Sequence, residues 1–403
     1  MTDLTGNIIV IVSILLMAPF MFSKKITRSQ LWQATVTPLA SIIGSGFLIA
    51  APLVVLTTGR WAIVAMFGIV TVAYFLGSVM RFNITYLEPY LARGDKSKII
   101  IPLEKASQPT LGIAYMISVA FYLKLLSVFA LSGLAVQSDI LENMLTTALL
   151  LLIGFLGWFK GLHTLEVLEK YAVTLKLIII GALIFSFFSF NISEVIKGEW
   201  SFFDHNHKTF FEAFQGLLGI LIIVQGFETS RYLGGLYTPE IRIRSMKYSQ
   251  IISGIIYVVF VSSAMILFHD VHTVSETVII DLCKIVAPIL PFLLIVAAIM
   301  SQLSAAVSDT IGSSGLISEA THKVVSIRRG IALTVAIAVS LIWLTDIYEI
   351  VVIASKAFAI YYGMQCLIAA RLAFNGKDTM RVYCFLTLSI LMLMVIFLGA
   401  PVA

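Results

Sequence analysis

Two glycines flank a serine in the middle of a long apolar stretch, at Gly44-Ser45-Gly46. The stretch covers residues 32–56, and about 20 apolar residues are enough for a helix to cross a bilayer. Each glycine costs a helix about 1 kcal/mol relative to alanine, and unwound backbone at membrane depth must be buried in protein or line a cavity. We predict an interrupted helix rather than a small-residue packing face, because glycines two residues apart point to different sides of a helix. The free N–H groups that start its second half would suit a carboxylate.

A second apolar stretch, residues 210–233, is interrupted in the same way by Gln225-Gly226-Phe227-Glu228. An interruption frees carbonyl groups at the end of the first half-helix, where the helix dipole is negative. Such carbonyls suit a cation. The two interruptions together can therefore hold a solute that carries both a carboxylate and an amine, largely through backbone atoms.

Ionisable side chains inside apolar spans are functional candidates. Lys176 lies about 8–10 Å into its span by the helical rise, and either changes its charge state or extends to the interface. Glu228 follows the second interruption, and either takes part in ion coupling or is a structural partner of the interruption or of Lys124. Lys124 lies about 20 Å deep and needs a partner or a wet cavity. We expect Lys124 to form a structural ion pair, with binding of an anionic group as the alternative.

Other polar residues in the spans give weaker signals. Asp309 either lines an inner vestibule or makes a helix-end hydrogen bond, and Lys356 is expected to extend to the outer interface. Ser304 and Ser308 lie four residues apart on one helix face, so their hydroxyls are candidate ligands for a sodium ion.

The sequence has no catalytic or metal-binding motif. Cys283, Cys366 and Cys384 are scattered, and no Walker loop, HExxH or GxSxG pattern occurs. His205 and His207 lie two residues apart, without a cysteine or a third histidine to complete a metal site. We therefore predict no metal site and no cofactor, and we do not expect an enzyme.

The composition is that of an all-α integral membrane protein. Of the 403 residues, 59% are hydrophobic and 12% are charged, whereas soluble domains have about 25% charged residues. The net charge of +5 reflects uneven loops and gives no reason to expect a nucleic-acid partner. We predict about twelve transmembrane helices, at 7–22, 32–56, 62–80, 108–136, 143–158, 171–190, 210–233, 248–268, 285–317, 330–345, 350–371 and 382–400.

The distribution of Lys and Arg predicts the orientation. Positive charge follows the first span, at Lys24, Lys25 and Arg28, so this span is expected to be an uncleaved helix rather than a signal peptide. Twenty of the 27 Lys and Arg residues fall in alternate loops, which include 81–107 with an expected short surface helix that stops near Gly94, and four fall in the other loops. Basic loops face the cytoplasm, so we expect both termini to be extracytoplasmic, in a cell (inner or plasma) membrane.

The two interrupted spans lie five spans apart and run in opposite directions across the predicted membrane. This is the pattern of an inverted-repeat secondary transporter, in which spans two to six and seven to eleven form two five-helix repeats. The predicted organisation is an extra N-terminal helix and basic loop (1–31), a ten-helix transport core (32–372, with repeats 32–190 and 209–372) and a C-terminal helix (373–403).

Four places along the chain carry a resemblance to a known family. They are Ile42-Ile43-Gly44-Ser45-Gly46-Phe47; Phe159-Lys160-Gly161 with Leu175-Lys176-Leu177 and Gly181; Gln225-Gly226-Phe227-Glu228 with Thr238-Pro239-Glu240; and 301–315. Together they resemble the amino acid–polyamine–organocation (APC) transporter superfamily, with its LeuT-type 5+5 fold. In the order given, they are similar to that family's first helix, its helix 4–5 connection and fifth helix, its sixth helix and following loop, and its hydroxyl-rich eighth helix.

The resemblance implies roles for individual residues. The N–H groups of Ser45 and Gly46 would bind the substrate carboxylate. In proton-coupled members a lysine at the position of Lys176 bridges the first and eighth helices, where sodium-coupled relatives hold a sodium ion, and loses its proton during the cycle. Carbonyl groups freed by the two interruptions, beside Gly226, would receive the substrate amine, and these belong to Ile42, Ile222, Ile223 and Gln225.

We therefore expect a secondary active transporter of an amino acid or a related amine-bearing solute, with protons as the coupling ion. Its partners would be that solute, protons and the lipid bilayer. A sodium-coupled transporter, or a transporter of metal ions or other solutes on the same fold, is the alternative. The first interruption offers only Ser45 and glycines, whereas a metal transporter is expected to place Asp, Asn or Met there.

Overall fold

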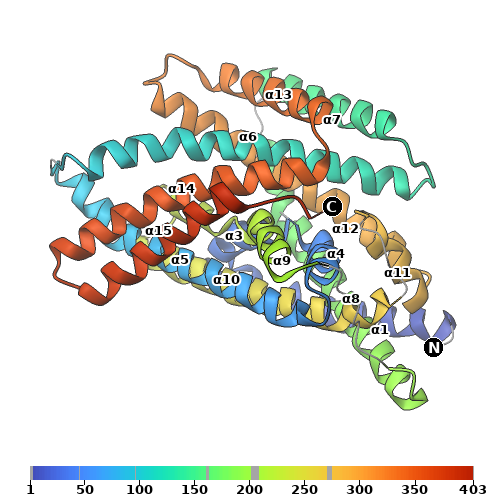
Figure 1. Cartoon of the computed structure of the whole chain (residues 1–403). Coiled ribbons are helices and arrows are strands. Elements are labelled where there is room, and N and C mark those ends of the chain that lie inside the picture. The colour runs from blue at the N-terminus through green and yellow to red at the C-terminus, as the bar shows by residue number, and fades with distance from the viewer. Residues whose placement is uncertain are drawn as a thin grey trace.

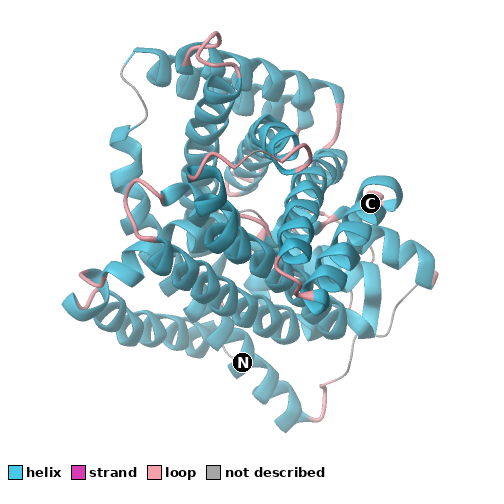
Figure 2. Cartoon of the chain, turned by 90° about the vertical axis from the view of Figure 1, so that its left-hand side faces the viewer, coloured by secondary structure: helices cyan, strands magenta, loops and turns pink. Residues whose placement is uncertain are grey.

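Helices occupy each of the twelve predicted spans. The computed structural model describes residues 3–44, 46–95, 97–159, 163–200, 208–269 and 275–402, and of Asp3, Ile222 and 163–171 only the backbone is described. Throughout these ranges the regular elements are helices, joined mostly by short loops (Figure 2). Their bounds are α1 (Asp3–Met21), α2 (Lys24–Thr27), α3 (Gln30–Gly44), α4 (Phe47–Thr58), η1 (Gly59–Trp61), α5 (Ala62–Ala92), α6 (Ile100–Ser132), α7 (Asp139–Phe159), α8 (His163–Lys197), α9 (Phe210–Gly219), η2 (Leu221–Val224), η3 (Phe227–Leu233), α10 (Pro239–Ala264), η4 (Met265–Phe268), α11 (Val278–Val286), α12 (Leu290–Ala320), α13 (Ile327–Leu344), α14 (Ile347–Asn375) and α15 (Thr379–Leu398).

The outer helices present apolar side chains to their surroundings. On α1, Leu15, Leu16 and Phe20 are each 65% exposed or more. In a soluble protein this surface would be in water, but in a bilayer it faces lipid. Ten helical stretches of the described ranges are long and apolar enough to cross a membrane, and one of them, Phe47–Ala92, includes the second half of the first interrupted span. The chain is therefore a multi-pass membrane protein.

The bundle is built around α6. Within the apolar part of α6, 89% of the residues are buried in protein, compared with 22% for α1 and α7. α12 and α14 pack against α6, while α10 packs against both α5 and α3. α7 and α13 lie together at the margin, and the two ends of the chain lie on the side of the bundle opposite the α5–α6 and α14–α15 turns (Figure 1). The interrupted helices are thus enclosed by uninterrupted ones.

The first interrupted span divides at the predicted place. α3 ends at Gly44 and α4 begins at Phe47, while Ser45 lies outside the described residues. Gly46 lies so close to the other interrupted span that a Cβ atom there would be 2.7 Å from Cγ2 of Ile223. A side chain at position 46 would therefore push the two spans apart.

The second interrupted span divides at Gly226. α9 ends at Gly219, and the chain continues through η2 to Gly226, whose φ of +115° is in the region that favours glycine. The half that follows, η3, is a 3₁₀ helix rather than the expected α-helix. Such stretches have tighter turns and poorer hydrogen-bond geometry, and often mark a hinge.

The prediction of a short surface helix in the loop 81–107 is wrong. Residues 81–92 continue α5, and α6 begins at Ile100, so the loop covers only 93–99. The polar residues of this stretch looked like loop residues because their partners are distant in sequence. Asn83 is fully buried against α14, and Glu88 accepts hydrogen bonds from Arg242 on α10. Gly94, with a φ of +73°, ends the extended helix.

We predict that Gly226→Ala destabilises the protein by at least about 1–3 kcal/mol, the usual cost of a strained backbone conformation. An added Cβ would lie 2.4 Å from Oγ of Ser41 and 2.8 Å from N of Ile42, so the change also separates η3 from α3. Thermal unfolding of the detergent-purified protein, followed by tryptophan fluorescence, measures the effect. Gly315→Ala is the matched control, because a Cβ there meets nothing within 4 Å, and its stability should be unchanged or slightly higher. Equal stability of the two variants would contradict the prediction.

Candidate functional site

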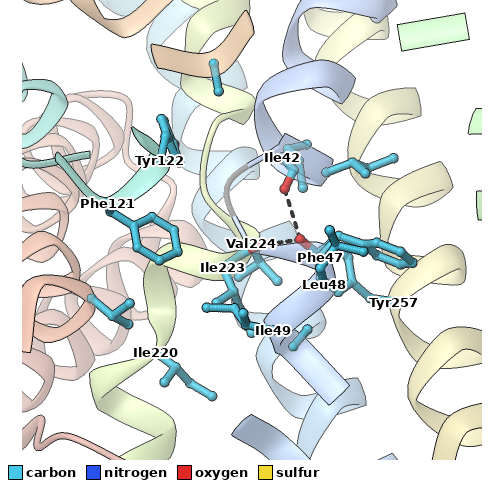
Figure 3. Close-up of a cluster of buried hydrophobic side chains, with 14 of the residues drawn as sticks. Ile42, Phe47, Leu48, Ile49, Phe121, Tyr122, Ile220, Ile223, Val224 and Tyr257 are labelled. Atoms are coloured by element: carbon cyan, nitrogen blue, oxygen red, sulfur yellow. Dashed lines mark hydrogen bonds between the residues drawn. The ribbon is translucent and has the colours of Figure 1, made fainter. Parts of the chain in front are cut away.

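The two interruptions meet at the hydroxyl of Tyr257. This hydroxyl lies 2.9 Å from the carbonyl oxygen of Ile42, at the end of α3, and 2.5 Å from that of Ile223, in η2 (Figure 3). Two of the predicted amine-binding carbonyls thus converge on one hydrogen-bond donor. Tyr257 was missed from the sequence, because a tyrosine inside the apolar span 248–268 has no distinguishing spacing.

Aromatic and aliphatic side chains surround this meeting point. Phe47 packs edge-on against Tyr257, with ring centroids 5.7 Å apart, and contacts Phe260 at 4.3 Å. On the other side, Gln225 donates from Nε2 to the hydroxyl of Tyr122 at 2.9 Å. The predicted site is therefore apolar, with a few polar groups at fixed positions, which is the usual character of a small-molecule site.

The place where the two interruptions meet has almost no empty space. The cavity bordered by Ile42, Val224 and Tyr257 has a volume of about 10 Å³, close to the minimum for one water molecule. A solute of amino-acid size cannot enter without movement of the half-helices. The structure therefore shows a closed arrangement of the interrupted spans.

Lys176 lies between the first interrupted span and α12. Its Nζ donates to the carbonyl oxygen of Ala40 at 3.1 Å and to Oγ of Ser301 at 3.0 Å, and the residue is 4% exposed. This burial excludes the alternative in which Lys176 extends to the interface. Ser301 also adjoins Gly44, where a Cβ would lie 3.5 Å from Oγ of Ser301. A change in the charge of Lys176 is thus placed to act on the last turn of α3.

Glu228 is fully buried beside the second interruption. Its Oε2 accepts hydrogen bonds from N of Gly226 at 2.9 Å and from the hydroxyl of Tyr362 at 2.7 Å, and the hydroxyl of Tyr115 lies 3.3 Å from Oε1. These three donors are neutral. The carboxyl group therefore holds the left-handed turn at Gly226 and joins it to α6 and α14.

The weaker candidates are spread along their helices. Asp309 is buried in α12, two turns from Ser301, whereas Ser304 and Ser308 are half-buried on the same helix. Lys176 thus contacts the hydroxyl of Ser301 rather than those of Ser304 and Ser308. Lys356 is half-buried in α14. His205 and His207, and the Lys160-Gly161 part of the helix connection, lie outside the described residues.

Lys124 forms the expected structural ion pair. Its Nζ lies 2.8 Å from Oε2 of Glu142 and donates to Oδ1 of Asn143 at 2.9 Å, which joins α6 to α7. It is not the partner of Glu228, which was one of the alternatives. The pair adjoins a polar cavity of about 430 Å³ that Glu142 and Glu276 help to line. Burial, with the charge of Glu142, raises the pKa of the Glu276 carboxyl.

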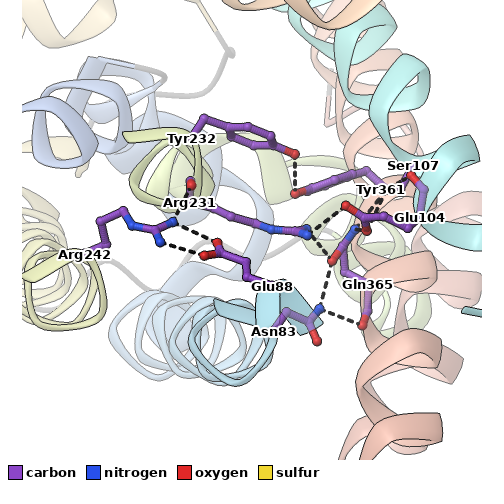
Figure 4. Close-up of polar contacts among 9 residues, drawn as sticks. All are labelled: Asn83, Glu88, Glu104, Ser107, Arg231, Tyr232, Arg242, Tyr361 and Gln365. Carbon is purple, nitrogen blue, oxygen red and sulfur yellow. Dashed lines mark hydrogen bonds and ion pairs between the residues drawn. The ribbon is translucent and has the colours of Figure 1, made fainter. Parts of the chain in front are cut away.

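A buried polar network closes the other end of α6 (Figure 4). Arg231 Nη2 lies 2.8 Å from Oε1 of Glu104, and Nη1 donates to Oε1 of Gln365 at 2.7 Å. Gln365 donates in turn to Oε2 of Glu104 at 3.0 Å and to Oγ of Ser107 at 2.9 Å. Asn83 donates to Oε1 of Gln365 at 2.8 Å. These bonds join α5, α6, η3 and α14.

A second ion pair adds α10 to the network. Both Nη atoms of Arg242 donate to Glu88, at 2.8 and 2.6 Å, and Nη1 also donates to the carbonyl oxygen of Arg231 at 2.7 Å. The hydroxyls of Tyr232 and Tyr361 lie 3.1 Å apart. The half-helix η3 is therefore bonded directly to three uninterrupted helices, α6, α10 and α14, and through Gln365 and Arg242 to α5. We call these residues the inner network: Asn83, Glu88, Glu104, Ser107, Arg231, Tyr232, Arg242, Tyr361 and Gln365.

We predict that Glu104→Gln opens the inner network. Removal of one partner from a buried ion pair costs about 3–5 kcal/mol, because the charge of Arg231 stays behind. Ser230 is a suitable reporter, since it is fully buried and its hydroxyl has no hydrogen-bond partner among the described residues. In a cysteine-free background with Ser230→Cys, maleimide labelling should become at least about tenfold faster, which corresponds to 1.4 kcal/mol.

Asp281→Asn in the same background is the control. The side chains of Asp281 and Lys284 form an ion pair and are each more than 60% exposed, and exposed ion pairs contribute little to stability. Its labelling rate should match the unaltered background. An unchanged rate in Glu104→Gln would show that the ion pair does not keep this end closed.

Solved structures with the same arrangement of helices are transporters. Two mutant forms of the manganese transporter of Eremococcus coleocola each align with 92% of this chain and 87% of their own, with a TM-score of 0.56. Their sequence identity to this chain is 12%, so the likeness is one of fold.

The sequence has a relative of nearly equal length. An uncharacterized protein of Aquifex aeolicus (strain VF5) is 43% identical over 400 residues, which is 98% of this chain and 97% of the relative. The family model of an APC superfamily transporter matches residues 24–399. The chain therefore belongs to the APC superfamily of transporters.

Proposed function

We propose that this protein is a secondary active transporter of an amino acid or a related amine-bearing small solute, coupled to protons. The observation that carries the proposal is the meeting of two interrupted helices, whose carbonyl groups at Ile42 and Ile223 face a single donor. Membership of a transporter superfamily supports it. A site made of backbone carbonyls at negative helix ends favours a positively charged amine.

The proposed solute site uses both interruptions. The N–H groups of Ser45 and Gly46 would take a carboxylate at the start of α4. Gly226 would provide the turn that brings the second span close to the first. The carbonyl groups that would take the amine belong to Ile42, Ile222, Ile223 and Gln225.

Lys176 and Glu228 are the proposed coupling residues. Lys176 is buried, and its Nζ contacts both the last turn of α3 and α12. Glu228 is buried between the second interruption and two tyrosines. Loss or gain of a proton at either group would change the hydrogen bonds that hold an interrupted span.

Transport of a metal ion is the alternative on this fold, because the solved neighbours are manganese transporters. In the ranges that the structure describes, no group of three His, Cys, Asp or Glu side chains is placed to hold a metal ion. The described residues at the interruptions offer two side-chain ligands, Gln225 and Glu228, and the Glu228 carboxylate already accepts hydrogen bonds from Gly226, Tyr115 and Tyr362. These features favour an amine over a metal. Sodium coupling through Ser304 and Ser308 is the other alternative.

The transport movement would be a rocking of the interrupted spans and their neighbours against the rest of the core. The inner network would separate when the site opens to the cytoplasm, since the Lys and Arg distribution places this end there. We propose the repeats 32–190 and 209–372 as the units related by this movement, with 1–31 and 373–403 outside the core. The proposed location is the cell (inner or plasma) membrane, with both termini extracytoplasmic.

A thermal-shift screen tests the proposed function. The purified protein is heated with amino acids, polyamines or divalent metal ions, with and without sodium and at two pH values. An amine-bearing solute should raise the unfolding temperature without sodium, because ligands stabilise the folded state by binding it selectively. A response to divalent metal ions alone would reject the proposal. If the solute raises the unfolding temperature only with sodium present, sodium rather than the proton is the coupling ion.

Lys176→Ala tests the coupling role. In proteoliposomes, we expect solute uptake driven by a pH gradient to lose its dependence on the gradient, because the buried amine that changes charge is gone. Lys356→Ala is the control, since Lys356 is half-buried in α14 and takes no part in the hydrogen bonds of Lys176 to Ala40 and Ser301. Uptake by Lys176→Ala that still follows the gradient would reject the role.

A further inference from the structure

The hydroxyl of Tyr257 lies where the two interrupted spans are nearest to each other. It is 2.9 Å from the carbonyl oxygen of Ile42 and 2.5 Å from that of Ile223, and Tyr257 is fully buried. These carbonyls come from different spans, whose residues are 181 positions apart in sequence. A side chain of a third helix, α10, therefore connects the ends of both half-helices.

A hydroxyl is a poor partner for two carbonyl groups. It has one hydrogen, so it donates to one oxygen at a time, whereas an ammonium group has three donor hydrogens and a positive charge. Hydrogen bonds from a charged donor are about twice as strong as neutral ones. An ammonium group in place of the hydroxyl would thus bond to both carbonyls at once and hold them more strongly.

We propose that Tyr257 is a placeholder for the solute amine, whose ammonium group displaces the tyrosine hydroxyl from the carbonyls of Ile42 and Ile223. In the empty protein the hydroxyl holds the two interrupted spans together. When solute enters, its amine takes over both bonds and the ring of Tyr257 moves aside. This inference rests on the proposed function and adds the residue that competes with the solute.

Room for the ring would have to come from the small cavity beside Tyr257. Ala73, Ser253 and Gly254 on α5 and α10 border it with small residues. Gln250 also borders the cavity and donates to the carbonyl oxygen of Ala73 at 2.7 Å, so the ring gains room when α5 and α10 separate at this bond. The contact of Tyr257 with Phe47 is edge-on, which leaves the tyrosine ring free of face-to-face stacking with that residue.

Tyr257→Phe tests the inference, because it removes the competing hydroxyl and keeps the ring. L-alanine, L-lysine and putrescine are the probes, titrated by calorimetry into the purified full-length protein. We expect the Kd of the probe that binds the unaltered protein to fall by about three- to tenfold, the factor that one neutral hydrogen bond contributes. The unfolding temperature of the empty variant should also fall.

Thr146→Val is the matched control for loss of a buried hydroxyl. Thr146 is fully buried, and its Oγ1 lies 2.8 Å from Oγ of Ser127, between α7 and α6 and away from the interruptions. This variant should lose thermal stability with an unchanged Kd. An unchanged or higher Kd in Tyr257→Phe would overturn the inference, since the hydroxyl would then be purely structural or a direct contact of the solute.

A second measurement needs no variant. The N,N,N-trimethyl form of L-alanine has no N–H group, so it cannot replace the hydroxyl, and we expect its Kd to be at least about tenfold higher than that of L-alanine. Equal affinity would overturn the inference while leaving the proposed function intact. Binding of none of the three probes by either the unaltered protein or Tyr257→Phe would overturn the inference, whereas the proposed function is decided by the wider thermal-shift screen.

Discussion

Backbone hydrogen bonding inside a membrane is the constraint on which this structure depends. Interruption of a helix leaves N–H and C=O groups without their helical partners, and lipid offers none. The chain meets this constraint by placing both interrupted spans inside a shell of uninterrupted helices and against each other. Gly46 packs onto Ile223, Gly226 packs onto Ser41, and the Tyr257 hydroxyl lies within hydrogen-bond distance of carbonyls at the end of α3 and in η2. Each interruption is thus stabilised by the other, and neither would be tolerated alone.

The same constraint explains why buried polar side chains are concentrated around η3, the second half of the second interrupted span. η3 is a 3₁₀ helix, so its own hydrogen bonds hold it less well than those of an α-helix. Glu228 fixes its start, and Arg231 anchors its middle to α6 and α14 through Glu104 and Gln365. A buried ion pair adds little net stability compared with apolar packing, but removal of one partner is strongly destabilising because the other charge stays buried and unpaired. These contacts hold η3 in the position that the structure shows, and loss of either charged partner would release it.

Much of this arrangement was predictable from the sequence. The twelve spans follow from hydropathy, and the glycines next to polar residues mark both interruptions, because such residues are costly at membrane depth. The inner network was not predictable, since Arg231 and Glu104 are 127 residues apart and α5 was expected to end before Glu88. Polar residues are easily predicted to lie in a loop when their hydrogen-bond partners in the fold are unknown. Tyr257 was missed for a related reason, because the carbonyl groups that it contacts belong to residues 215 and 34 positions away.

The positions of Lys176 and Tyr257 relative to α3 suggest how an ion and a solute would act on one another. Nζ of Lys176 donates to the carbonyl oxygen of Ala40, the group that an α-helix pairs with the N–H of Gly44. Tyr257 donates to the carbonyl oxygen of Ile42, two residues further on. Both side chains therefore bind the final turn of the same half-helix, from α8 and from α10. A change in either bond alters the carbonyls available to the other, so protonation and solute binding would be coupled through one turn of backbone, without a longer chain of side chains between them.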